Sequence, residues 1–518
     1  MRWTRGHGPV GREWPRQGFA LVTSMMLLLV LTTSITTTMM VSGLQARVSS
    51  NMQYSLQAAY LAEAGLQHAL FQLRRDTQWR DGIAATALGA GTYSVAVSQP
   101  TLQDDITLTA TGQVSGAVRS AVMTIRTHIV TIAGTGVSGS DGDGGAAVAA
   151  ELDNPARVVF DAQGNLLIAD TGNHRIRRIT PGADGIITGA PDERISTIAG
   201  TGVAGGGGNG GRATAAQLHA PAGLVLDQQG RLFIAEQGGH RVRLVIPGAD
   251  GVISGAADEI ISTVVGTGTA GNSGNGGRAT NAQLSKPTAL VFDAQGALFI
   301  ADEGNESIRR VDPGGDGLIT GATDEVITTV AGILGMGGSP SDWFPATWGR
   351  LNDPAGVFFD AFGHLLIADQ DNNRIRRVVP GADGRITGAL DETITTVVGT
   401  GTSGFSGDGG AATAARLQRP ESLVVDTRGN LWFADERNDR IRRVIPGADG
   451  RITGGLDEII STLAGGGTTL GDNGPSAAAR LNRPEGIMVD AAGNLVIADT
   501  NQHRVRRTML RIIRWDGA

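Results

Sequence analysis

Residues 156–179 read ARVVFDAQGNLLIADTGNHRIRRI, and this stretch decides the fold because it recurs along the last three quarters of the chain. Six copies begin near prolines that follow one another in steps of 64 to 67 residues. These prolines are Pro155, Pro221, Pro287, Pro354, Pro420 and Pro484. A regular period of this kind indicates one supersecondary unit repeated along the chain.

Each unit predicts four short β-strands. In the fourth unit these are GVFFD, HLLIAD, RIRRVV and TITTVVG, separated by turn-rich segments. Four antiparallel strands per unit are typical of a propeller blade, so six units predict a mainly β protein with a six-bladed β-propeller. The 78 glycines among 518 residues suit the many tight turns that such a fold needs.

The sixth copy ends after its third strand, at RRTMLRIIRWDGA. The missing fourth strand has a counterpart upstream of the first unit, in HIVTIAG at residues 128–134. We therefore expect residues 129–133 to complete the sixth blade by strand exchange, which removes an exposed sheet edge and closes the ring.

The recurring pattern D-x-x-G-x-L-x-(I/F)-A-(D/E), followed by R-(I/V)-R, resembles the NHL repeat. The GDGGAATAARL segment at residues 407–417 is also typical of bacterial NHL proteins. The resemblance covers about residues 128–518 and implies an NHL-type propeller.

Two sets of acidic residues recur in every unit. In the first set, an aspartate precedes a glycine by three positions between two strands, which is turn chemistry. Its members are Asp161, Asp227, Asp293, Asp360, Asp426 and Asp490. The second set is Asp170, Glu236, Asp302, Asp369, Asp435 and Asp499. We expect structural ion pairs between the second set and arginines of the next strand, such as Arg175, Arg374, Arg440 and Arg504; the alternative is a ring of carboxylates open to a cation.

Two further features are weak candidates for metal sites. His174, His240 and His503 share one position in three units, but equivalent positions on neighbouring blades point in parallel directions rather than toward one zinc ion. The segment PGADGIITGAPDE at residues 181–193, which recurs in five units, predicts a long hairpin, with calcium as the alternative. The aspartates concerned are Asp184, Asp250, Asp316, Asp383 and Asp449. No cofactor is expected apart from this possible calcium ion.

The N-terminus predicts a membrane segment. Residues 1–18 contain four arginines, and residues 19–46 contain no charged residue. A stretch of about 20 apolar residues is enough to span a bilayer, with the basic flank in the cytoplasm. This segment could be a simple membrane anchor, and a second alternative is an uncleaved export signal.

The junction RQGFALV at residues 16–22 resembles the cleavage site of type IV prepilins, and QAAYLAEAG at residues 57–65 resembles the PilX group of minor pilins. The resemblance implies that prepilin peptidase cuts between Gly18 and Phe19. It also implies other pilins and the pilus assembly machinery as partners. The fifth mature position, glutamate in most pilins, is Thr23 here, and subunits that lack this glutamate resemble those at fibre tips.

The predicted organisation has four parts. A prepilin-type leader at 1–18 precedes a long transmembrane and stalk helix at 19–75. Residues 76–127 predict a small antiparallel sheet, with alternating strands at 92–99, 105–114 and 119–127. The propeller occupies 128–518.

Composition and motifs exclude several functions. Without cysteine the chain has no disulfide, thiolate nucleophile or cysteine-ligated zinc. A net charge of −7 gives no electrostatic case for a nucleic acid partner. There is no Gly-x-Ser-x-Gly elbow, His-Glu-x-x-His motif or phosphate loop, so we expect no catalytic residues.

The repeat is broken in one connecting segment. Residues 332–351, GILGMGGSPSDWFPATWGRL, bring Trp343, Phe344 and Trp348 into a chain that is only 4% aromatic. Exposed aromatic residues in a loop on a rigid scaffold are common in binding sites. The alternative is that they pack on a neighbouring blade or on the pilin-like head.

The sequence thus predicts a minor pilin-like subunit, of the tip type, that displays a propeller for binding a surface, protein or glycan. It would be inserted in the inner membrane through residues 19–46 and then reach the pilus or cell surface. The alternatives are an envelope-anchored propeller enzyme of the lactonase or lyase kind, and a purely structural tip subunit.

Overall fold

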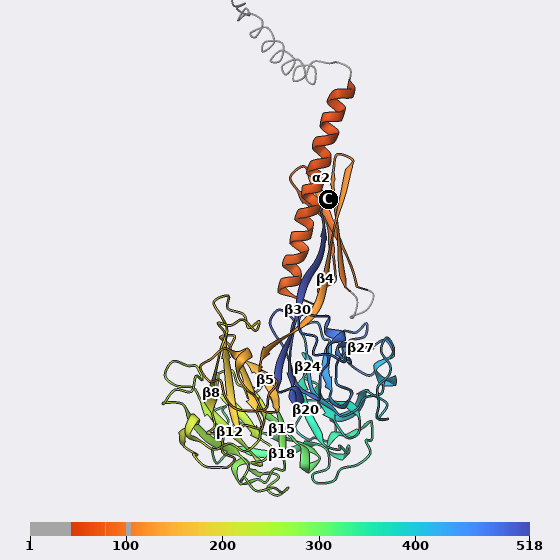
Figure 1. Ribbon diagram of the computed structural model, residues 1–518. Coiled ribbons are helices and arrows are strands. Elements are labelled where there is room, and N and C mark those ends of the chain that lie inside the picture. The colour runs from red at the N-terminus through yellow and green to blue at the C-terminus, as the bar shows by residue number, and fades with distance from the viewer. Residues whose placement is uncertain (1–42, 78, 100–104, 518) are drawn as a thin grey trace, which may run out of the picture.

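A single stalk helix rises from one side of a ring of β-sheets (Figure 1). The computed structural model describes residues 43–77, 79–99 and 105–517. The stalk helix, α2, spans Gly43–Arg75. The leader, the cleavage site and the predicted helix from 19 to 42 lie outside the described residues. In the described part of the chain, no helix is long and apolar enough to cross a membrane.

The second half of α2 packs on a small antiparallel sheet. Its strands follow one another in the order β1 (Ile83–Leu88), β2 (Gly91–Ser98), β3 (Ile106–Val114) and β4 (Ala117–Ala133). Leu66 and Leu73 of the helix share an apolar core with Met123 and Ile125 of β4. Helix and sheet approach closely at Gly112, where a side chain would collide with the carbonyl oxygen of Ala58. The predicted sheet is thus present, with β1 as an additional strand.

Five repeats each form a separate sheet of four main strands. The first three sheets contain β5 (Pro155–Phe160), β6 (Leu166–Asp170), β7 (Arg175–Thr180) and β8 (Arg194–Ala199); β10 (Pro221–Leu226), β11 (Leu232–Glu236), β12 (Arg241–Ile246) and β13 (Ile260–Val265); and β15 (Pro287–Phe292), β16 (Leu298–Asp302), β17 (Ser307–Val311) and β18 (Val326–Ala331). The next two contain β20 (Pro354–Phe359), β21 (Leu365–Asp369), β22 (Arg374–Val379) and β23 (Thr393–Val398); and β24 (Pro420–Val425), β25 (Leu431–Asp435), β26 (Arg440–Ile445) and β27 (Ile459–Gly465). The two-residue strands β9 (Gly211–Arg212), β14 (Gly277–Arg278) and β19 (Phe344–Pro345) add to the outer edges of β13, β18 and β23.

The sixth repeat does not form a sheet of its own, so the structure has five separate blades and not the six like blades that the repeat predicts. Its strands β28 (Pro484–Val489), β29 (Leu495–Asp499) and β30 (Arg504–Asp516) belong to a seven-stranded sheet in the order β1-β2-β3-β4-β30-β29-β28. Within it, β30 pairs with β4 from Val505 opposite Ala133 to Asp516 opposite Val122.

The long strand β4 crosses the boundary predicted between residues 127 and 128, so the head and the propeller are not separate sheets. Residues 129–133 pair with β30 as the displaced strand requires, but β30 continues beyond them into the stalk (Figure 1). The continuation was not predicted, because residues 510–516 have no counterpart in the third strands of the other repeats.

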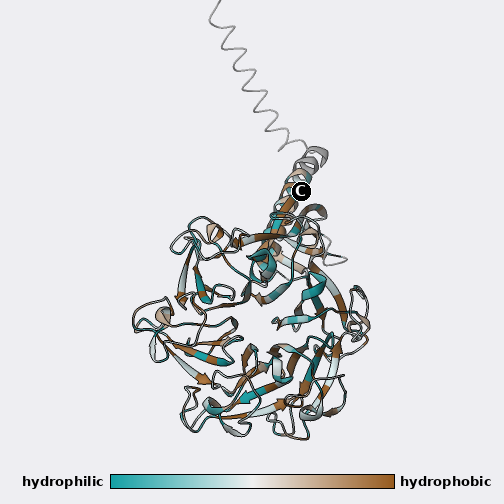
Figure 2. Cartoon of the chain, turned by 60° about the horizontal axis from the view of Figure 1, so that its bottom comes forward, coloured by the Kyte–Doolittle hydropathy of each residue, from teal (hydrophilic) through white to brown (hydrophobic). Residues whose placement is uncertain are grey.

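The sheets stand around a ring with their first strands innermost (Figure 2). The first strands of consecutive repeats lie against one another, and β28 also lies against β5. Apolar side chains fill the space between neighbouring sheets. Phe233 of β11, for example, packs edge to face on Phe292 of the next repeat at a centroid distance of 5.0 Å.

Candidate functional site: an axial cavity

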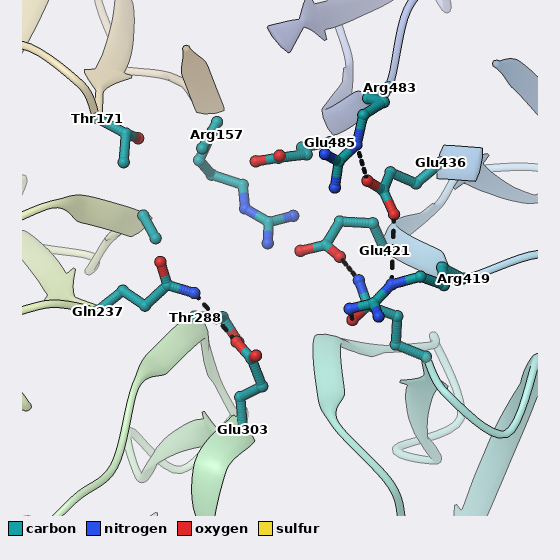
Figure 3. Close-up of a pocket in the computed structure, with 13 residues that line it drawn as sticks. Arg157, Thr171, Gln237, Thr288, Glu303, Arg419, Glu421, Glu436, Arg483 and Glu485 are labelled. Atoms are coloured by element: carbon teal, nitrogen blue, oxygen red, sulfur yellow. Dashed lines mark hydrogen bonds and ion pairs between the residues drawn. The ribbon is translucent and has the colours of Figure 1, made fainter. Parts of the chain in front are cut away.

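A cavity of about 160 Å³ lies where the first strands of the repeats begin and the second strands end. Its lining includes Arg157 near the start of β5, Glu485 near the start of β28 and Glu303 just after β16. Figure 3 shows the side chains of Arg157, Glu421 and Glu485 directed into the same space. The site is therefore assembled around the axis of the ring from residues far apart in the sequence.

The cavity is lined at positions where the repeats differ. The residue after the repeat proline faces it in most units, and this residue is acidic in only the last two. The six residues are Ala156, Ala222, Thr288, Ala355, Glu421 and Glu485. The positions that recur in every repeat did not indicate this site. The signal was the departure from the repeat beside each proline.

In all repeats but the first, which has Arg157, a small residue at the next position lets the first strands approach one another. A side chain at Gly356 would collide with the carbonyl oxygen of Glu421, and one at Gly486 would collide with that of Ala156. Glycine therefore permits the close approach that brings the polar groups around one small cavity.

One carboxylate of the cavity, that of Glu436, is compensated by three arginines, of which Arg437 lies 3.7 Å from Oε2. Glu436 Oε1 accepts a hydrogen bond from Arg483 Nε at 2.5 Å, and its Oε2 lies 3.6 Å from Arg419 Nε. Arg419 also pairs with Asp371 at 2.7 Å. Figure 3 shows Glu436 between Arg419 and Arg483 along one wall of the cavity.

Three other carboxylates have neutral partners or none. Glu303 accepts a hydrogen bond from Gln237 Nε2 at 3.1 Å, and Glu421 accepts one from Gln370 Nε2. Among the described residues, no cation lies within 4.0 Å of the carboxylates of Glu303, Glu421 or Glu485. Burial and nearby carboxylates raise the pKa of Glu485 to about 7 and that of Glu421 well above its ordinary value. The cavity therefore holds one carboxyl group, that of Glu485, which changes its protonation near neutral pH.

The second acidic set is structural, and its arginine partners lie two residues later than predicted. Asp302 Oδ2 lies 3.2 Å from Arg309 Nη1, and both side chains are fully buried. Its Oδ1 accepts the backbone N–H of Ser285 at 2.7 Å. The equivalent arginines are Arg177, Arg243, Arg376, Arg442 and Arg506. The alternative of a carboxylate ring open to a cation is wrong, because these acids have no exposed surface.

Arginines at the predicted positions bind elsewhere. Arg175 and Arg374 donate to the backbone carbonyls of Thr201 and Thr400, and Arg504 donates to that of Thr135. The exception is Arg241, which pairs with Glu236, whose side chain is longer by one methylene than the aspartates of the other units. Side chains alternate between the two faces of a strand, so the arginine that pairs with the acid lies on the same face as the predicted arginine two residues before it.

The three histidines connect neighbouring repeats. Each has a left-handed backbone, and its Nδ1 accepts the backbone N–H of the residue before the next repeat proline. His174 binds Ala220 at 3.1 Å, His240 binds Lys286 at 3.1 Å and His503 binds Asn154 at 3.2 Å. These residues are separated around the ring, which explains why they do not converge on one metal ion.

The two predicted turn motifs are also present. Asp161 Oδ1 accepts the backbone N–H groups of Gln163 and Asn165 between β5 and β6. In the PGADG hairpins, each calcium candidate accepts the backbone N–H two residues later, as Asp184 does from Ile186 at 2.9 Å. Asp250, Asp316, Asp383 and Asp449 do the same. The described residues contain no group of three or more acidic or histidine residues that could hold a metal ion.

The aromatic residues of the broken repeat are exposed. Trp343 is 79% exposed, Phe344 50% and Trp348 57%. They lie at the outer edge of the fourth blade, where β19 pairs with β23 and Trp343 N donates to Ile394 O at 2.9 Å. The alternative that they pack in a core is therefore wrong, and the backbone that carries them is anchored to a blade.

Two family models match separate parts of the chain. Residues 17–67 match the PilX N-terminal model, and residues 152–179 and 481–507 match the NHL repeat model. The chain joins a PilX N-terminal segment to NHL repeats. The PilX match includes Gly18 and Phe19, which lie outside the described residues, and the NHL matches fall in the first and sixth repeats.

Curated relatives are similar to the NHL part. SUPPRESSOR OF QUENCHING 1 of Arabidopsis thaliana is 27% identical over 322 residues, which are 60% of this chain and 26% of that protein. NHL repeat-containing protein 2 of Gallus gallus is 26% identical over 371 residues, which are 68% of this chain and 46% of that protein. The chain therefore spans less than half the length of either relative.

Solved structures of similar shape have low identity. An auxiliary nutrient binding protein from Bacteroides ovatus aligns with a TM-score of 0.49 and 14% identity, over 81% of this chain and 89% of that one. Virginiamycin B lyase from Staphylococcus aureus aligns with a TM-score of 0.38 and 14% identity, over 82% and 97%. At these scores the superpositions carry no argument about function.

Proposed function

We propose that this chain is a pilin-type subunit that displays its NHL propeller as a binding module at the tip of a fibre. The observation that carries the proposal is where the stalk meets the ring. Thr77 donates from its backbone N–H to Ala492 O and from its hydroxyl to Gly493 O, both at 2.7 Å, in the turn between β28 and β29. The axial cavity lies at the other end of β28, so it opens on the side of the ring away from the stalk contact.

The stalk also holds the ring firmly. Asp76 pairs at 2.6 Å with Arg428, in the turn between β24 and β25. The β4–β30 ladder passes from the small sheet into the sixth repeat, with register shifts at Val505/Arg506 and Ile512/Arg514. Two backbone connections and these side-chain contacts support a fixed orientation of the propeller, which suits display of a binding surface.

We also infer that β4 completes a composite sixth blade and closes the ring. Ile132 and Ala133 share an apolar core with Val158 of the first repeat and Val496 of the sixth. The hydroxyl of Thr500 donates to Pro155 O at 2.8 Å, as that of Thr171 donates to Pro221 O at 2.7 Å. The sixth repeat thus makes the same contact with the first as the first makes with the second.

An apolar stripe on α2 supports packing against other pilin subunits. Met52, Leu56 and Tyr60 follow one another at four-residue spacing and are 75%, 56% and 64% exposed. Contiguous exposed apolar side chains are typical of interaction surfaces. The partners proposed for this region are the neighbouring pilins and the assembly machinery, in the inner membrane and then in the fibre at the cell surface.

Processing provides a direct test of the pilin-type assignment. We expect prepilin peptidase to remove residues 1–18 and leave a methylated Phe19, because the PilX match spans the Gly18–Phe19 junction. Mass spectrometry of the mature N-terminus measures this. Gly18→Val should leave the leader attached, and an intact Met1 in the wild-type protein would contradict the assignment.

The exposed aromatic patch, formed by Trp343, Phe344 and Trp348, is the proposed contact surface for the partner, whether a protein, a glycan or an inert surface. Replacing all three by alanine should shift the free energy of unfolding by less than about 1 kcal/mol, because surface side chains contribute little to stability. Attachment of intact fibres should fall severalfold, since aromatic residues carry much of the energy of binding interfaces.

Surface attachment and thermal melting are measured on the same triple variant. Val203→Ala is a matched control, because Val203 is an apolar residue, 58% exposed, in the equivalent kind of connecting segment. A large loss of stability, or attachment equal to that of the control, would contradict the role of the patch.

An enzyme remains the second candidate, and the raised pKa values of Glu421 and Glu485 favour it. Turnover of a lactone panel that is lost in Glu485→Gln would support the lactonase-like alternative. Fibres that attach normally without any propeller ligand would instead support a purely structural tip subunit.

A further inference from the structure

We propose that the axial cavity binds a small organic cation that carries a primary ammonium or guanidinium group. This inference is independent of the aromatic patch and of assembly into a fibre. It depends on the charges of the cavity, on a buried polar atom without a hydrogen bond and on the kinds of side chain in its lining.

The lining has fewer positive than negative charges available to a ligand. Arg419 and Arg483 are engaged by Glu436 and Asp371. Of the described lining residues, Arg157 is then the remaining cation, and it interacts with the charges of Glu421 and Glu485 without an ion pair within 4.0 Å. A cationic ligand would supply the missing positive charge.

The raised pKa values of Glu485 and Glu421 are consistent with an excess of negative charge in the cavity. Burial is the main cause that raises the pKa of Glu485, followed by the charge of Glu436; Arg157 and Arg483 oppose the shift, and Glu303 adds to it. For Glu421 the causes are burial and then Glu485, with Arg157 again in opposition. Near neutral pH a proton on Glu485 offsets part of the negative charge, and a bound cation would displace it.

A buried polar atom provides a second, separate indication of a ligand. Glu436 lines the cavity with only 2% of its side chain exposed, and its Oε2 accepts no hydrogen bond among the described residues. Arg419 Nε and Arg437 Nε lie 3.6 and 3.7 Å from this oxygen, which is ion-pair distance but beyond hydrogen-bond distance. Buried carboxylate oxygens are normally hydrogen-bonded, because an unmet acceptor is costly. A donor group on a ligand would satisfy this atom.

The acidic residues are also not needed by the fold. Four of the six repeats have alanine or threonine after the repeat proline, where Glu421 and Glu485 stand in the last two. All six repeats nevertheless form the same first strand. The two glutamates therefore represent a specialisation of one side of the cavity.

The lining distinguishes an amine from other cations. Its acceptors are carboxylates, amide oxygens of Gln237 and Gln370, and threonine hydroxyls, which all bind N–H donors. No aromatic residue is among the described lining residues, so the aromatic cage that a quaternary ammonium prefers is missing. The described carboxylates do not form a group that could hold a metal ion, and they are spread around the cavity instead.

Calorimetric titration of the full chain tests the proposal. Putrescine and agmatine are the free-amine probes, Nα-acetyl-lysine amide represents the side chain of a peptide, and tetramethylammonium has the same charge without N–H donors. We expect binding of at least one of the first three and none of tetramethylammonium. Binding by putrescine alone would indicate a free diamine, and binding by the lysine derivative would indicate a peptide.

The pH dependence of the affinity distinguishes binding in the cavity from binding to acidic residues on the surface. Affinity should be about tenfold or more higher at about pH 8.5 than at about pH 5.5, because Glu485, whose pKa is raised to about 7, is protonated at the lower pH and must lose its proton to bind a cation. Titration in buffers of different ionisation enthalpy should show proton release near neutral pH.

The variants Glu421→Gln and Glu485→Gln should each weaken binding about tenfold or more, since each removes a charged hydrogen-bond acceptor. Asp184→Asn is the matched control, because Asp184 is an exposed acid in a hairpin away from the cavity, and it should leave affinity unchanged. Melting curves of each variant verify folding, and Ala222→Leu, which fills the cavity without changing its charge, should also abolish binding. Absence of binding by all three amines at pH 8.5, or equal affinity in the glutamine variants and the control, would overturn the proposal.

Discussion

Replacing Ile132 by alanine should lower the free energy of unfolding of the full chain by about 2–5 kcal/mol, which is the usual cost of removing a buried isoleucine side chain. Ile132 lies in β4 and is fully buried. It packs with Val158 of the first repeat and Val505 of β30, so it belongs to the core that connects the two ends of the propeller. Chemical denaturation followed by circular dichroism measures the loss.

Val137→Ala is the control for this experiment. Val137 follows β4 within a few residues but is 59% exposed, so its truncation should change stability by less than about 0.5 kcal/mol. If both variants were equally stable, residues 129–133 would not be part of the propeller core, and the inference of a composite sixth blade would fail.

The second large effect is expected at the buried ion pair of the third repeat. Asp302→Ala should cost about 3–5 kcal/mol, because it leaves the buried guanidinium of Arg309 without its counter-ion. The same change removes the acceptor for Ser285 N and for Asn305 Nδ2, which bind the Asp302 carboxylate at 2.7 and 2.8 Å. The loss is again measured by denaturant unfolding of the full chain.

Two further variants separate the ion pair from other effects. Asp316→Ala removes an exposed acid of the same repeat and should be nearly neutral. The double variant Asp302→Leu/Arg309→Met should recover part of the stability, since removing both charges costs less than removing one. A single variant as stable as the control would show that the pair does not stabilise the blade.

The sequence alone was sufficient for features that depend on local patterns. The six repeats, the four strands of the first five and the Asp161-type turns follow from alternation of side chains and from turn chemistry, both of which act over a few residues. The NHL and PilX segments were likewise recognised from short motifs, and the family models confirm them. The repeat also indicated that residues 129–133, which precede the first copy, supply the fourth strand that the sixth copy lacks.

The arginine partners show where local reasoning was insufficient. Both arginines of each R-x-R pattern lie on the same face of the strand, so the pattern did not distinguish Arg175 from Arg177. Which arginine pairs with Asp170 depends on a segment that is distant in sequence. Arg177 also donates to Asp143, 34 residues earlier, at 2.7 Å. The extension of β30 into the small sheet was hidden for a similar reason, because a strand does not encode which edge it will join.

The axial cavity was decided by the tertiary structure alone. Arg157 and Glu485 are more than 300 positions apart, yet they line one cavity because the first strand of the first repeat lies beside that of the sixth. Each side chain follows an unremarkable proline, and only the arrangement of the repeats in a ring turns these separate positions toward a common axis. The sequence by itself determined the units, whereas burial and charge at the axis depend on how the units are brought together, since both are properties of neighbours that lie far apart along the chain.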